Sequence, residues 1–189
     1  MTATLRSAAP APPATSPRSE LDLAQQLTLL RVANAVAHQA LQDGHHPFGA
    51  VLVAPDGHTV LLRQGNVDAV NHAEAVLARE AARLYPHEFL WDCTLVTTVE
   101  PCCMCAGTQY WAHIGRLVYG ISESDLLALT GNHAENPTLA LACREVFARG
   151  QKAMQVWGPI GAVDAALADE ITALHRDFWS GSRADRLSA

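Results

Sequence analysis

The sequence has no long apolar run and only small shares of charged and aromatic side chains. Charged residues make up 17% and aromatic residues 6% of the 189 positions, whereas hydrophobic residues make up 49%. No stretch approaches the roughly 18 consecutive apolar residues that a membrane helix needs. This composition is typical of a folded globular protein, so we expect a soluble, cytoplasmic chain with no membrane partner.

Basic residues are also scarce. Thirteen Lys and Arg face nineteen Asp and Glu, which gives a formal net charge of −6. Proteins that bind nucleic acid neutralise phosphates with Lys and Arg. The C-terminal Arg176, Arg183 and Arg186 are too few, and too mixed with acids, to form a basic cluster. The charge balance therefore argues against nucleic acid as a partner.

The cysteines do not suit a disulfide framework. The chain has five, an odd number, and three of them lie within residues 102–105. Even numbers at regular spacings are typical of disulfide-stapled domains, whereas clustered thiols in a reduced compartment indicate metal binding. We therefore expect free thiols and a metal site.

The apolar pattern predicts one α/β domain between two tails. Residues 1–19 are rich in alanine and proline and are expected to be disordered, and residues 182–189 are expected to be flexible. Strands are predicted at residues 49–54, 59–63, 94–99, 116–120 and 154–157. Helices are predicted at residues 21–43 with Ser19 as the cap, 72–85, 103–113, about 138–149 and about 162–179, with a helical turn near Asp125. Alternating strands and helices over residues 20–181 indicate a three-layer α/β/α sandwich with a partly parallel sheet.

Two short segments carry the chemistry, and the first is Pro101-Cys102-Cys103-Met104-Cys105. Cys102 and Cys105 stand at i and i+3 at the start of a predicted helix, so they share one face. The helix N-terminus favours negative charge and therefore favours thiolates. With His72 as the natural third ligand, the set binds zinc and leaves the fourth tetrahedral position open, as catalytic zinc sites do.

The second segment is His72-Ala73-Glu74. Glu74 follows the histidine by two residues, so it can lie near the metal without binding it. A carboxylate there can take a proton from zinc-bound water, whose pKa falls to about 7, and return it to a leaving group. Taken singly, the cysteine segment would also suit redox chemistry or structural zinc. A zinc-stabilised, non-catalytic binding protein is the alternative from a different functional class.

Together the two segments match the zinc-deaminase signature H-x-E…P-C-x-x-C. Over about residues 25–160 the chain resembles the cytidine-deaminase-like superfamily, in the branch of guanine deaminases, tRNA adenosine deaminases and fungal-type cytosine deaminases. The motifs that carry the resemblance are Pro47-Phe-Gly-Ala-Val51, His72-Ala-Glu74, Glu100-Pro-Cys-Cys-Met-Cys105 and Arg116-Leu-Val-Tyr-Gly120.

This resemblance implies a central five-stranded mixed sheet flanked by helices, one Zn²⁺ per subunit and a homodimer. It also implies hydrolytic deamination, in which zinc-bound hydroxide adds to an amidine-like ring carbon and ammonia leaves. Glu74 is the catalytic proton shuttle in that scheme, and His72, Cys102 and Cys105 are the metal ligands.

The resemblance also implies contacts with a small-molecule substrate. The expected contact residues are Asn66, Phe48, Ala73, Trp111, Asp125 and Glu100, the last through its backbone carbonyl. Several of them would equally suit a purely structural role: a turn for Asn66, core packing for Phe48 and Trp111, and a solvated first helical turn for Asp125. The C-terminal Phe178-Trp179 could cover the site of its own or of a partner subunit, or form an ordinary apolar helix face.

Guanine is the first substrate candidate. An acidic residue such as Asp125 can accept hydrogen bonds from purine N–H donors. Where guanine deaminases usually have Gly-Phe, this chain has Leu127-Ala-Leu-Thr-Gly-Asn132, so amino-triazines, pterins and pyrimidines also remain candidates. Cytosine deamination is one alternative. Adenosine deamination in tRNA is another, which Cys102-Cys-Met-Cys-Ala-Gly107 favours and the net charge opposes.

Overall fold

The computed structural model describes residues 20–131, 133 and 136–179. The predicted tail over residues 1–19, Ser19 as a helix cap and the predicted flexible end over residues 182–189 lie outside the described residues. Within the described part, no helix is long and apolar enough to cross a membrane.

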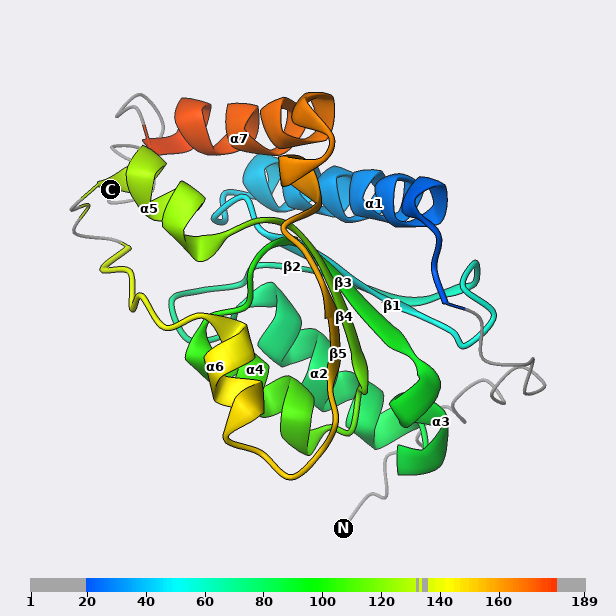
Figure 1. Cartoon of the computed structure of the whole chain (residues 1–189). Coiled ribbons are helices and arrows are strands. Elements are labelled where there is room, and N and C mark those ends of the chain that lie inside the picture. The colour runs from blue at the N-terminus through cyan, green and yellow to red at the C-terminus, as the bar shows by residue number, and fades with distance from the viewer. Residues whose placement is uncertain (1–19, 132, 134–135, 180–189) are drawn as a thin grey trace, which may run out of the picture.

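A five-stranded sheet with the order β2-β1-β3-β4-β5 forms the middle layer (Figure 1). β1 pairs with β2 and with β3 in antiparallel fashion, whereas β3, β4 and β5 run parallel. The strands are β1 (Gly49–Val53), β2 (Val60–Gly65), β3 (Thr94–Val99), β4 (Arg116–Ile121) and β5 (Gln155–Trp157). The predicted mixed, five-stranded sheet is therefore confirmed.

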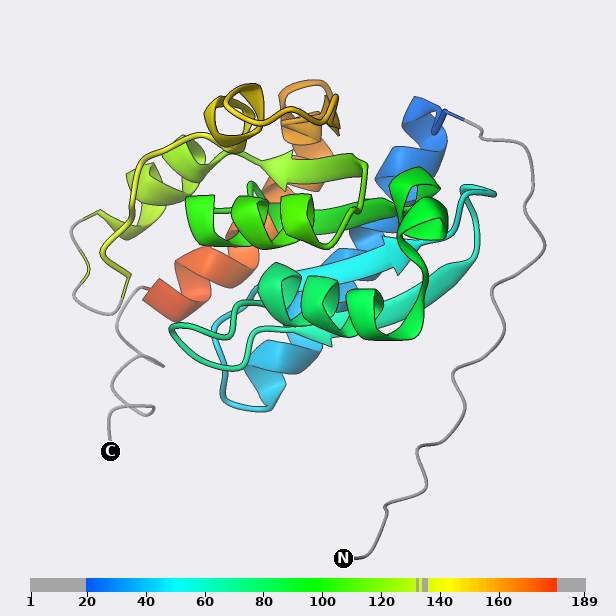
Figure 2. The same cartoon turned by 90° about the horizontal axis from the view of Figure 1, so that it is seen from below.

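Helices cover both faces of this sheet (Figures 1 and 2). One face carries α1 (Leu23–Gln42) and α7 (Ala165–Trp179), and α5 (Glu123–Thr130) packs against α7. The other face carries α2 (Ala73–Leu84), α3 (His87–Asp92), α4 (Cys103–Trp111) and α6 (Cys143–Ala148). A 3₁₀ turn at Ile160–Ala162 leads from β5 towards α7. The arrangement is the three-layer α/β/α sandwich that the sequence predicts.

The two cores follow from the alternation of side chains along the central strands. In β1, Ala50 and Leu52 join the core beneath α2, whereas Val51 and Val53 join the core beneath α1. Successive side chains of a strand point to opposite faces, so a sheet covered on both faces needs apolar residues at every position. The uninterrupted apolar run of this strand is thus explained by its central place.

Gly49 allows α1 to lie directly against the start of β1. A Cβ atom at this position would come within 2.3 Å of the Ala33 carbonyl oxygen and 2.5 Å of the Ala37 nitrogen. Any side chain would push the helix away from the strand. This close approach fixes the position of Phe48, the residue immediately before the strand.

Some helices differ from the prediction. Asp22 caps α1 by accepting a hydrogen bond from the Gln25 N–H at 2.8 Å, so the helix begins at Leu23. The predicted helix over about 138–149 is limited to Cys143–Ala148. Residues 136–142 have no regular secondary structure, and residues 136–139 line a pocket instead. The helix α3 was not predicted, because its six residues are too few for a recognisable helical period.

Candidate metal centre and active site

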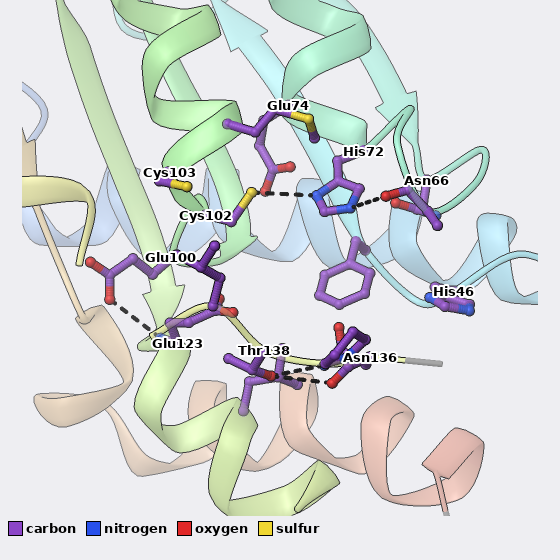
Figure 3. Close-up of a pocket in the computed structure, with 16 residues that line it drawn as sticks. His46, Asn66, His72, Glu74, Glu100, Cys102, Cys103, Glu123, Asn136 and Thr138 are labelled. Carbon is purple, nitrogen blue, oxygen red and sulfur yellow. Dashed lines mark hydrogen bonds between the residues drawn. The ribbon is translucent and has the colours of Figure 1, made fainter. Parts of the chain in front are cut away.

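Two helix N-termini bring the three predicted metal ligands together. His72 is the N-cap of α2, Cys102 is the N-cap of α4, and Cys105 lies one turn further along α4. The His72 Nδ1 atom is 3.6 Å from the Cys102 Sγ atom, a contact drawn in Figure 3. The same nitrogen is 3.5 Å from the Cys105 Sγ atom. All three atoms lie within 4.8 Å of one another.

These distances fit a tetrahedral zinc ion. With Zn–S bonds of about 2.3 Å and Zn–N bonds of about 2.0–2.1 Å, tetrahedral angles separate nitrogen and sulfur by about 3.6 Å. The other ring nitrogen of His72, Nε2, lies 3.1 Å from the carbonyl oxygen of Ala69. A hydrogen bond from the second nitrogen orients a metal-bound imidazole. The cluster therefore supplies three ligands and leaves a fourth position open.

The charges of the cluster suit a cation. The hydrogen bond from Cys105, followed by that from His72, lowers the pKa of Cys102 to about 4. The same contacts raise the pKa of Cys105 and of His72. These contacts favour the thiolate form of Cys102, the form that binds zinc. Binding a dication releases the remaining thiol proton, as zinc sites require.

Glu74 lies beside the metal ligands, and a residue of the sheet binds its carboxyl group. Its side chain is buried, and the Thr97 Oγ1 atom donates a hydrogen bond to its Oε1 atom at 2.7 Å. Burial raises the pKa of Glu74. A carboxylate with a raised pKa holds a proton long enough to return it, which suits a proton shuttle.

A cavity of about 290 Å³ opens beside these groups, at the carboxyl ends of β3 and β4. Ligands of open α/β sheets bind outside the carboxyl ends of the strands. The chain segments that line the cavity are far apart in the sequence (Figure 3). The lining residues are His46, Phe48, Asn66, Ala69, His72, Glu74, Glu100, Cys102, Cys103, Met104, Glu123, Leu126, Asn136, Pro137, Thr138 and Leu139.

Three of the predicted substrate contacts lie in this lining. Asn66 follows β2 and is buried, and its Nδ2 atom donates to the carbonyl oxygen of Asp68 at 3.2 Å. Phe48 precedes β1, and its carbonyl oxygen accepts a hydrogen bond from the Asn66 N–H at 3.0 Å. Glu100 follows β3. Their contact with a substrate stays a prediction.

The other three predicted contacts lie outside the lining. Ala73 is buried in the core beneath the sheet. Trp111 ends α4, is 75% exposed, and lies beside Tyr110 and the Lys152 ammonium group. Asp125 is exposed. Its carboxylate accepts hydrogen bonds from the Ser122 N–H and hydroxyl groups in the capping box of α5. Within one chain, Trp111 and Asp125 therefore lie at the surface and do not line the pocket.

Glu123 is the acidic residue that the sequence analysis missed. It begins α5, two residues before Asp125, and lines the cavity (Figure 3). Burial first, and then the nearby charges of Cys102, Glu74 and Glu100, raise the pKa of Glu123 to about 7. The signal that could have identified Glu123 is the capping residue Ser122. With Ser122 as the N-cap, Glu123 is the first helical residue and Asp125 the third, and their side chains point in different directions.

The C-terminal aromatic pair supports the same pocket. The rings of Phe178 and Trp179 each lie 5.1 Å from the ring of His46, which lines the cavity. Phe178 is fully buried and Trp179 nearly so. The end of α7 thus packs behind His46, a residue of the pocket wall in the same chain.

Comparison with known proteins agrees with this geometry. Residues 23–121 match the family described as the cytidine and deoxycytidylate deaminase zinc-binding region. A probable cytosine deaminase of Schizosaccharomyces pombe is 33% identical over 168 residues, which cover 87% of this chain and 96% of that protein. The guanine deaminase of Bacillus subtilis is 37% identical over 103 residues, or 52% of this chain and 65% of that enzyme.

A solved structure has the same fold. The guanine deaminase from Nitrosomonas europaea superposes with a TM-score of 0.60 at 25% identity, and the match covers 85% of each chain. The matched family region contains the His72, Cys102 and Cys105 cluster. The chain therefore belongs to the cytidine and deoxycytidylate deaminase family of zinc-dependent hydrolytic deaminases.

Proposed function

We propose that this chain deaminates a free nucleobase or a small aminated heterocycle, with guanine as the first candidate. The observation that carries the proposal is the charge of the pocket. Among the described residues that line it, none is Lys or Arg, whereas Glu74, Glu100 and Glu123 are acidic. A phosphate group would find no Lys or Arg side chain there and would be repelled by carboxylates. An uncharged base fits such a pocket.

Glu74 is positioned for the proton transfers of hydrolytic deamination. A zinc ion held by His72, Cys102 and Cys105 supplies a Lewis acid that makes water nucleophilic at neutral pH. The Glu74 carboxylate accepts a proton from the attacking water and passes it to the ring nitrogen beside the reacting carbon. A second proton transfer converts the amino group to ammonia, which leaves as the carbonyl forms. The hydrogen bond from Thr97 keeps the carboxylate in place throughout.

Guanine is favoured by the groups on two sides of the cavity. The Glu123 carboxyl group can accept hydrogen bonds from N–H donors, and the Asn66 side-chain amide can both donate and accept. Guanine offers N–H donors as well as a carbonyl acceptor. The relatives from B. subtilis and N. europaea are both guanine deaminases, which supports this choice.

Cytosine is the second candidate. The alignment with the S. pombe probable cytosine deaminase extends over nearly the whole of both chains, further than the alignment with the B. subtilis enzyme. Deamination of adenosine in tRNA has weaker support, because the net charge of −6 and the acidic pocket are poorly suited to a polyanion.

Ammonia release tests the proposal directly. Zinc-loaded protein would be assayed with guanine, adenine, cytosine, guanosine, cytidine, ammeline and a tRNA anticodon stem-loop. We expect turnover of guanine or another free base and none of the stem-loop. Activity on the stem-loop alone would contradict the proposal.

Glu74→Gln tests the proton shuttle in the same assay, with Glu80→Gln as its matched control. The amide preserves size and hydrogen bonding but cannot carry the proton, so kcat should fall by about 10²–10⁴ while zinc content is unchanged. Glu80→Gln, on the same helix and at the ion pair of Glu80 with Arg83, should retain wild-type activity. Full activity of Glu74→Gln would show that the proton shuttle is assigned wrongly.

A further inference from the structure

The Glu100 carboxylate joins two segments that are distant in the sequence. Glu100 directly follows β3 and is buried. Its Oε1 atom accepts a hydrogen bond from the Cys143 N–H at 2.9 Å, and its Oε2 atom accepts one from the Glu123 N–H at 3.3 Å. Each oxygen of one carboxylate is therefore used by a different helix.

These two N–H groups are the first of α5 and the first of α6. The chain that runs from α5 to α6 supplies a large part of the cavity wall. Its described residues in that wall are Glu123, Leu126, Asn136, Pro137, Thr138 and Leu139. Glu100 thus holds both ends of the segment that faces the cavity. Its contact with Glu123 can be followed in Figure 3.

The same residue is directly connected to the metal centre. Only Pro101 separates Glu100 from the metal ligand Cys102. The proline ring fixes one backbone dihedral, so this connection is short and stiff. A displacement of the wall relative to the metal ligands would have to stretch the Glu100 contacts.

Neither helix replaces these contacts locally. The N-cap of α6 is Ala142, which offers no side-chain acceptor. In α5 the Ser122 side chain accepts from the Asp125 N–H, a different group from the Glu123 N–H that Glu100 binds. A buried N–H group without an acceptor is costly, so the wall depends on Glu100 for its position.

We propose that Glu100 is a positioning residue whose side chain sets the distance between the metal centre and the substrate-facing wall. The proposal rests on the proposed function, because it gives the wall the task of holding the heterocycle. Glu100 acts through the backbone of Glu123 and Cys143, and its carboxylate is not required to touch the substrate.

Glu100→Gln is the sharpest test. The amide retains one oxygen but turns an NH₂ group towards the second N–H, so only one of the two contacts survives. We expect KM for the best substrate of the ammonia assay to rise roughly tenfold, which corresponds to one lost charge-assisted hydrogen bond. The zinc content should stay at the wild-type value, and kcat should change much less than KM.

Two further variants complete the test. Ser122→Ala is the matched control, because it removes the side-chain cap of α5 and leaves the Glu100 contacts intact. Glu123→Gln combined with Glu100→Gln closes a double-mutant cycle. If Glu100 acts by placing Glu123, the two effects on KM should be less than multiplicative.

The outcomes are distinguishable. A wild-type protein that releases ammonia from no heterocycle would overturn the proposed function, and this proposal with it. Turnover with an unchanged KM in Glu100→Gln would overturn this proposal alone. An equal rise of KM in Ser122→Ala would also overturn it, because general fraying of α5 would then account for the effect.

Discussion

The metal end of the pocket and its substrate-facing wall are built in different ways. The metal end comes from the N-termini of α2 and α4, so His72 and Glu74 are neighbours, as are Cys102 and Cys105. The wall comes from α5, from residues 136–139 and from the end of α7 behind His46. Chemistry is thus specified locally, whereas recognition is assembled from distant parts of the chain.

This difference predicts which kinetic parameter each region controls. At the metal end every reacting group has an internal partner, such as Ala69 for His72 and Thr97 for Glu74. Substitutions there should lower kcat or remove the metal. The wall touches the metal end through Glu100, so substitutions in the wall should change KM and leave zinc in place.

The largest expected effect is at a metal ligand. Cys102→Ser replaces a thiolate with an alcohol that binds zinc poorly at neutral pH. Since even outer-sphere partners of a metal ligand change affinity or activity by about 10–100-fold, we expect activity to fall by more than about a hundredfold. The midpoint of thermal unfolding should also fall, because bound zinc stabilises the folded state. Zinc analysis and a thermal melt measure both effects.

The adjacent cysteine provides the control. Cys103 lines the cavity but lies outside the three-residue cluster. Cys103→Ser should therefore keep its zinc and its melting midpoint. If both variants lost zinc equally, the division between ligand and wall residues at this helix N-terminus would be wrong.

A smaller effect is expected at Thr97, which supports Glu74 from the sheet. Thr97→Val keeps the shape of the side chain and removes the hydroxyl that donates to Glu74 Oε1. Loss of a hydrogen bond to a charged group should lower kcat by about tenfold with little change in KM. Steady-state kinetics on zinc-loaded protein would measure the two parameters.

Thr98, the next residue of β3, is a matched control. Its hydroxyl lies 3.4 Å from the Gly49 nitrogen and has no contact with Glu74 among the hydrogen bonds of the described residues. Thr98→Val should keep kcat within about twofold of the wild-type value, as expected when no hydrogen bond to a charged group is lost. A fall in kcat equal to that of Thr97→Val would point to a general loosening of the strand.

The metal end could be predicted from the sequence because the spacing of its residues along the chain determines how their side chains are placed. Positions i and i+3 at a helix start share one face whatever the rest of the fold does. The strands were predictable for a similar reason, since a sheet covered on both faces has apolar runs such as Gly49–Val53. Local periodicity in the sequence therefore predicts both the strands of the sheet and the metal ligands.

The wall could not be predicted, because its geometry depends on contacts between distant residues. The start of α6 is set by Glu100, which lies 43 positions earlier, so the predicted helix began too early. In α5 the sequence suggested Asp125 as the pocket carboxylate, whereas Asp125 is exposed and bonds back to Ser122, and Glu123 lines the cavity. A difference of two positions along the helix decides which side chain faces the cavity.

An effect of similar size in free energy is the pH dependence of stability that Glu123 gives the wall. Burial raises the pKa of Glu123 from its ordinary value of 4.5 to about 7 in the folded state. Between these values the folded protein binds more protons than the unfolded chain, so its stability falls as pH rises. The contribution is complete below about pH 4.5 and lost above about pH 7. Allowing for solvent screening of a partly exposed group, we expect a change of about 1–2 kcal/mol.

Glu123→Gln removes this titration and should make the free energy of unfolding depend less on pH. Urea unfolding of zinc-loaded wild type and variant would be compared between pH 5 and 8, with zinc content checked at each pH. The variant should gain stability relative to wild type as pH rises towards 8, because the buried amide avoids the cost of a buried charge. Parallel curves would show that Glu123 is already solvated or neutralised in the zinc-loaded protein. The pH dependence of stability would then not come from the Glu123 carboxyl group of the wall.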